Sequence, residues 1–106
     1  MASRKLGLLL STDTSHPSVD TVFKLAEASL RQGVEVYLYL IVEGVKNMKD
    51  PRFALLLDGG TRLSVCAYGC QQHGVSTVDV DSRISLSGLV VLSRIIDGCD
   101  RFLAFT

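Results

Sequence analysis

Short apolar runs that alternate with helix-like segments constrain the fold of this chain most strongly. The two clearest runs are residues 5–11, KLGLLLS, and residues 34–42, VEVYLYLIV. Near-continuous apolar residues indicate strands that are buried on both faces, which is typical of parallel sheets covered by helices. The sequence therefore predicts an α/β protein in which strands and helices alternate.

Signals for helix starts and ends separate the predicted strands. Apolar residues at helical spacing run through residues 19–30, and Gly33 stands where a residue just past a helix end is expected. Asp50 and Pro51 are typical of the first residues of a helix, here continuing over residues 52–58.

The second half of the chain continues the alternation. We expect a strand at residues 61–66, a short helix at 67–73, a weak strand at 76–80, a helix capped by Ser87 or Ser85, and a last strand at 100–105. The expected architecture is a single three-layer α/β/α domain with a mostly parallel five-stranded sheet.

Length and charge limit the classes of function. The 106 residues suffice for one domain with one core. Eleven Lys and Arg balance eleven Asp and Glu, so no excess positive charge points to direct nucleic-acid or membrane binding. The same balance gives little resistance to self-association.

The N-terminal segment and the cysteines indicate a cellular compartment. The apolar run before Ser11 is too short for a secretory signal, and the longest run, 36–42, is far shorter than a membrane span. We therefore expect a cytoplasmic protein, in which the three cysteines remain thiols.

The segment 64–74, SVCAYGCQQHG, holds the residues most able to carry chemistry. Cys66 ends a predicted strand and precedes a predicted helix, at the sheet edge where parallel α/β proteins bind ligands. Free N–H groups of the first helical turn favour a thiolate, the nucleophilic form of cysteine. The position suits covalent sulfur chemistry, and a buried packing cysteine is the alternative.

The neighbouring soft side chains give weaker signals. Cys70 lies one helical turn after Cys66, where Cβ atoms are about 5–6 Å apart, too far for a disulfide without unwinding. Zinc would need a fourth ligand besides these two cysteines and His73, and Cys99 comes from another element. We expect no metal and no cofactor, and packing roles for Cys70 and Cys99.

Three segments resemble one known family. VCAYGCQQHGV, residues 65–75, resembles the reactive-cysteine segment of the DsrE/TusD family of sulfurtransferase subunits. EGVKNM (43–48) is similar to its Glu/Asp-Gly-Val stretch, and LSGLVVLSRIIDGCDRFLAF (86–105) to its C-terminal helix and strand. The resemblance covers nearly the whole chain and implies one DsrE-like sulfur-transfer domain over residues 1–106.

The resemblance implies a function and a site. A member of this family accepts sulfane sulfur as a cysteine persulfide and passes it to a partner protein. Cys66 matches the persulfide cysteine, and Gly44 and Val45 match a loop that helps form the pocket. The other expected pocket residues follow Cys66 in the chain: Ala67, Tyr68, Gly69, Cys70 and His73, the last standing where many members have Arg.

The resemblance also implies partners and leaves an alternative open. We expect sulfur-donor and sulfur-acceptor proteins, and a homo- or hetero-oligomer such as a trimer or hexamer. The alternative is a non-catalytic oligomeric subunit or a small-ligand-binding protein of the same fold. A flavin or response-regulator function is disfavoured, because residues 11–18, STDTSHPS, lack a Gly-rich phosphate loop and offer only Asp13 as an acid.

Overall fold

Five parallel strands form one sheet in the computed structural model of the protein, which describes residues 4–106. The strands are β1 (Lys5–Leu10), β2 (Glu35–Leu40), β3 (Arg62–Cys66), β4 (Ser85–Ser87) and β5 (Arg101–Phe105). They lie in the order β4-β3-β2-β1-β5, and every pairing is parallel. The predicted parallel five-stranded sheet is confirmed.

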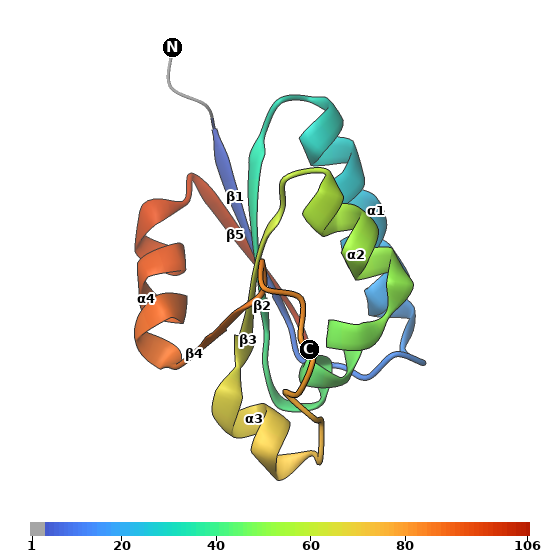
Figure 1. The fold of residues 1–106 in the computed structure, drawn as a ribbon. Helices are drawn as coiled ribbons and strands as arrows, with labels where there is room; N and C mark the ends of the chain where they lie inside the picture. Colours follow the sequence, from blue (N-terminus) through green and yellow to red (C-terminus); the bar gives the residue numbers. More distant parts are fainter. Residues whose placement is uncertain (1–3) are drawn as a thin grey trace.

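Helices cover both faces of the sheet, as Figure 1 shows. One face carries α1 (Pro17–Arg31), α2 (Pro51–Asp58) and the 3-10 helix η1 (Val42–Lys49), and the other carries α4 (Leu89–Gly98). The short helix α3 (Ala67–Gln72) follows β3 directly and lies beyond the carboxyl end of the sheet. The predicted three-layer α/β/α arrangement is confirmed.

The face toward α1 and α2 forms the main core. Leu8 pairs with Leu38, Leu10 with Leu40, and Leu40 with Val65, so these side chains lie on the same face. All five are fully buried. Each buried side chain of this size contributes about 1.5–3 kcal/mol relative to exposure. This face holds the strands in register and positions their carboxyl ends.

The predicted helix boundaries on this face are confirmed. The Asp50 carboxylate accepts a hydrogen bond of 2.9 Å from the Arg52 N–H, and Pro51 is the first helical residue of α2. Gly33 follows the end of α1 with a φ of +77°, and Gly74 follows the end of α3 with a φ of +65°. Glycine reaches this left-handed conformation at little cost.

The prediction of a strand at residues 76–80 is wrong. These residues form turns and irregular chain, and Asp79 has a φ of +60°, which no strand tolerates. The fourth strand is β4, only three residues long and largely exposed at the sheet edge. Its pairing with β3, not its own apolar pattern, makes it a strand.

Two other predicted boundaries are also wrong. Ser85 and Ser87 do not cap α4, because both lie in β4, and the cap is Gly88, without a side-chain hydrogen bond. The second strand stops at Leu40, because the chain leaves the sheet after it and Val42 opens η1 with a φ of +57°.

Candidate functional site

Cys66 is the last residue of β3 and caps α3, at the carboxyl edge of the sheet. Its side chain accepts a hydrogen bond from the Gly69 N–H, with an N···Sγ distance of 3.4 Å. The residue is 6% exposed. The strand-to-helix position predicted for this cysteine is confirmed, and one first-turn N–H is directed at its sulfur.

An apolar cavity of about 640 Å³ opens beside Cys66. Its walls come from the residues that follow β2, from the first turn of α3 and from the junction of β4 with α4. Val42, Tyr68 and Leu89 line it and remain 49%, 66% and 62% exposed, so apolar side chains surround its mouth. An apolar site strengthens electrostatic interactions at the sulfur, because it excludes water.

Two hydroxyl groups lie close to Cys66, and sequence reasoning missed both. Ser87 is the register partner of Cys66 on β4 and lines the same cavity. Its Oγ is buried without a hydrogen-bond partner within residues 4–106. Tyr39 is fully buried and donates to the Gly88 carbonyl over 3.1 Å, with the Ser87 carbonyl at 3.5 Å.

The Tyr39 hydroxyl stays protonated at neutral pH. Burial, and then the neighbouring Cys66, raise the pKa of Tyr39 to about 12. The phenol therefore remains a donor and holds the β4–α4 junction that carries Ser87. A buried Tyr usually donates its O–H to a hydrogen-bond partner. A tyrosine within an aliphatic strand is therefore the sequence signal that indicates such a bond.

The structure brings some of the predicted pocket residues together and not others. Ala67, Tyr68 and Gly69 line the cavity with Cys66. Gly44 and Val45 are buried but do not line it, and a Cβ on Gly69 would lie 3.0 Å from a Val45 methyl carbon. Val45 therefore packs against the first turn of α3, whereas Gly44 packs against the end of β1.

Cys70, His73 and Cys99 also lie outside the lining of this cavity. Cys70 is 1% exposed, and burial raises the pKa of its thiol, as does the nearby Cys66. His73 is the C-terminal cap of α3. Cys99 ends α4 and lies against β1, where a Cβ on Gly7 would be 3.2 Å from its sulfur. Cys70 is buried and Cys99 partly buried, and the packing roles expected for them stay predictions.

Among residues 4–106, no three His, Cys, Asp or Glu side chains lie close enough together to share a metal ion. In that part of the chain, no helix combines the length and the apolar composition that crossing a membrane requires.

Comparisons with known proteins place this geometry in context. The model of the DsrE/DsrF-like family matches residues 4–105. No curated protein was found to match. The fold is similar to the YchN protein of E. coli, with a TM-score of 0.84, 16% identity, and coverage of 98% of this chain and 100% of that one.

Two further solved structures share the fold. Protein BT1422 of unknown function from Bacteroides thetaiotaomicron has a TM-score of 0.78 at 18% identity, covering 95% of this chain and 94% of its own. Protein MTH1491 of unknown function from Methanobacterium thermoautotrophicum has a TM-score of 0.75 at 16% identity, covering 98% and 100%. At these identities the likeness establishes the fold alone.

Proposed function

Because the chain belongs to the DsrE/DsrF-like family, which is associated with sulfur relay, we propose that it is a cytoplasmic sulfur carrier. In this proposal Cys66 accepts sulfane sulfur as a persulfide and passes it to a partner protein. The observation that carries the proposal is the position of the Cys66 sulfur, which accepts the Gly69 N–H beside an apolar cavity.

The transfer needs no external oxidant or reductant. The Cys66 thiolate attacks the outer sulfur of a donor persulfide, R–S–SH, and the S–S bond of the donor breaks. The donor leaves as R–S⁻, and Cys66 becomes Cys–S–SH, which loses a proton to give Cys–S–S⁻. An acceptor thiolate then attacks the outer sulfur and releases the Cys66 thiolate.

The cavity suits a bound outer sulfur for two reasons. Its apolar walls exclude water, which protects a persulfide from side reactions. Its polar groups are few and close to Cys66: the first-turn N–H of Gly69 and the unpaired hydroxyl of Ser87. The exposed apolar mouth suits the approach of a protein partner, since such patches mark interaction sites.

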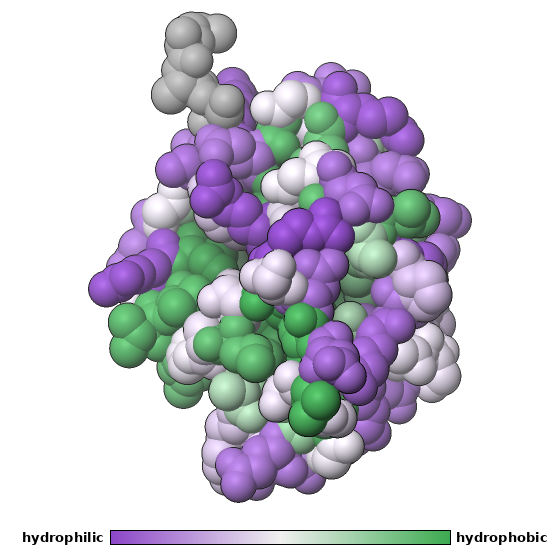
Figure 2. All heavy atoms as spheres, in the orientation of Figure 1, coloured by the Kyte–Doolittle hydropathy of each residue, from purple (hydrophilic) through white to green (hydrophobic). Residues whose placement is uncertain are grey.

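We also propose that the protein works as an oligomer, a trimer or hexamer of itself or with related subunits. Leu89, Val90 and Ile96 of α4 are 62%, 67% and 46% exposed, and Figure 2 shows hydrophobic atoms gathered at the surface over this helix. Burying such residues between subunits would stabilise the oligomer by about 25 cal/mol for each Å² of apolar surface removed from water. Sedimentation at micromolar concentration tests this: a monomer only would contradict it.

The decisive experiment measures sulfur on Cys66. After incubation with a persulfide donor, the intact mass should increase by one sulfur atom, and a reductant should reverse the change. The sulfur should map to the peptide with Cys66, be absent in Cys66→Ser, and persist in the matched control Cys70→Ala. Sulfur on Cys99, or equal reaction of all three thiols, would contradict the proposal.

The alternative is a non-catalytic subunit of the same fold. The low exposure of Cys66, 6%, favours it, because a donor must bring its sulfur into the cavity to react. Rates of alkylation by iodoacetamide in the native protein separate the two functions. A carrier requires Cys66 to react much faster than Cys70 and Cys99, whereas a packing residue would react as slowly as they do.

A further inference from the structure

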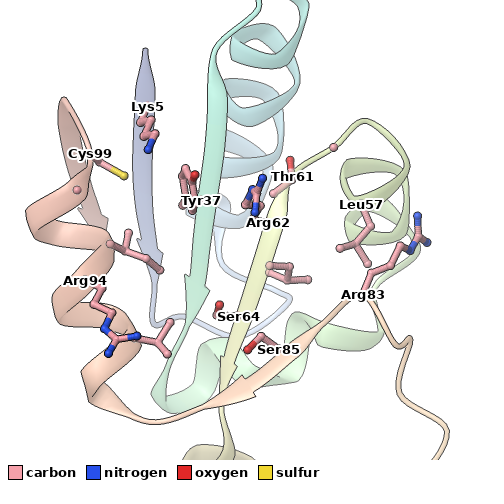
Figure 3. A pocket seen from close by; sticks show the side chains of 15 residues that line it. Lys5, Tyr37, Leu57, Thr61, Arg62, Ser64, Arg83, Ser85, Arg94 and Cys99 are labelled. Carbon is pink, nitrogen blue, oxygen red and sulfur yellow. The ribbon is translucent and has the colours of Figure 1, made fainter. Parts of the chain in front are cut away.

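A second cavity, about 750 Å³ in volume, lies on the α4 face of the sheet (Figure 3). Strands β2, β3 and β4 form its floor through Tyr37, Ser64 and Ser85, and α4 forms one wall. The volume falls within the range of about 300–1,000 Å³ that small-molecule sites occupy. Cys66 does not line this cavity, so it is separate from the cavity beside that cysteine.

The charge of the cavity is positive. Three basic residues line it, Lys5, Arg62 and Arg94, and none of them forms an ion pair within residues 4–106. No Asp or Glu is among the described residues that line the cavity. Arg83 also lines it, but Asp58 and Asp81 neutralise its guanidinium at 2.8 Å each. Unpaired cations in a concave apolar setting attract anions strongly.

Arg62 and Arg94 are the cations of the cavity that are most available to a ligand. Glu35 is the register partner of Lys5, and the Asp100 carboxylate accepts a hydrogen bond from the Lys5 backbone N–H, so acidic groups lie close to that lysine. Arg62 lies over the Tyr37 ring, with its Cζ 5.7 Å from the ring centre. Figure 3 shows Arg94 reaching from α4 toward the sheet. The two guanidinium groups therefore reach the same cavity from different elements.

A buried hydroxyl group in the lining also lacks a partner within residues 4–106. Thr61 and Ser64 are 4% and 8% exposed, and both line the cavity. The Thr61 hydroxyl is buried with no hydrogen-bond partner within residues 4–106. Leaving a buried hydroxyl unpaired is costly, so such groups usually bond a ligand or a water molecule.

We propose that this cavity binds a small organic anion, with an apolar body and a carboxylate or phosphate group. Arg62 and Arg94 bind the acidic group, because a guanidinium presents two parallel N–H donors to carboxylate or phosphate oxygens. The Tyr37 ring and Ile95 contact the apolar body, and the hydroxyl of Ser64 supplies a further hydrogen bond.

Calorimetric titration with four probes at constant ionic strength tests the proposal. Naphthoate and naphthyl phosphate carry both required parts, 2-naphthylmethanol lacks the charge, and inorganic sulfate lacks the apolar body. We expect one site per chain for the two aromatic anions, with the tighter one identifying the acidic group. Binding of naphthylmethanol or sulfate with equal affinity, or no binding of either aromatic anion at millimolar concentration, would overturn the proposal.

Charge-matched variants locate the site. Arg62→Gln and Arg94→Gln should each weaken binding of the aromatic anion at least tenfold, while Arg31→Gln, on the exposed end of α1, should leave it within twofold. Equal effects of all three substitutions would show that binding depends only on the net charge of the protein, and would overturn the proposed site. Sedimentation at each point of the titration gives a last test. If the affinity for the aromatic anion falls as subunits assemble, a second copy of the chain, not a small anion, occupies the cavity.

Discussion

Substitution of Gly44 by Ala should destabilise the protein more than the addition of one methyl group suggests. Gly44 is buried in η1, and its backbone passes directly against the end of β1. A Cβ there would overlap the Leu10 carbonyl oxygen and lie 2.8 Å from the Leu10 carbonyl carbon and 3.2 Å from the Ser11 Cα. The obstacle is backbone, so no side-chain rotation relieves it.

The magnitude follows from what must move. β1 is paired on both sides, with β2 and β5, so its end cannot shift without breaking ladder hydrogen bonds. Overpacking a core costs about 1–3 kcal/mol, and a fixed backbone neighbour places this case at about 3 kcal/mol or more. For a domain of this size that corresponds to a decrease in Tm of about 12–24 °C.

Urea unfolding followed by circular dichroism measures the change, with Gly98→Ala as the matched control. Gly98 is the last residue of α4 and has no atom within 4 Å of a Cβ built there. That alanine should be neutral or stabilise by up to about 1 kcal/mol, because helical glycine costs backbone entropy. A loss below about 1 kcal/mol for Gly44→Ala would refute the reasoning, because it would show that β1 and η1 separate easily.

Three further predictions concern single side chains. Tyr39→Phe removes the donor to the Gly88 carbonyl and should cost about 1–2 kcal/mol in urea unfolding, and a cost below 0.5 kcal/mol would count against the hydrogen bond. The Arg52 side chain and N–H lower the pKa of Asp50, so its charge stabilises the folded state above the unfolded value of about 3.9. That contribution is lost as pH falls through the lower folded pKa, so the stability difference between wild type and Asp50→Asn should shrink from pH 6 to pH 2, and a constant difference would contradict it. Cys70, whose pKa is raised by burial, should react with iodoacetamide only after unfolding, and labelling of Cys70 in native protein, followed by mass spectrometry, would disprove this.

Local signals in the sequence were sufficient for much of the fold. The Asp50-Pro51 pair and Gly33 act through hydrogen bonds and φ values of single residues, so they are visible without tertiary contacts. The apolar runs of β1 and β2 reflect burial on both faces. Cys66 was found because a strand end and a helix start are both local features.

Features that depend on partners distant in the sequence were not predictable. β4 is a strand only because β3 lies beside it, and its three residues carry no strand pattern of their own. Tyr39 and Gly88 are 49 residues apart, so their hydrogen bond has no sequence signal. Gly44 was assigned to a pocket loop by resemblance, whereas the structure explains it by close packing against β1.

The place of β1 between β2 and β5 in the sheet has a consequence for synthesis on the ribosome. β1 forms at residues 5–10, but its neighbour β5 forms only at residues 101–105, and Leu6 pairs with Arg101. During most of translation one edge of β1 therefore has unpaired N–H and C=O groups that can pair with other chains. The nascent chain is most prone to aggregate in this interval, and a delayed release of β5 should lower the yield of folded protein even though every core contact remains available.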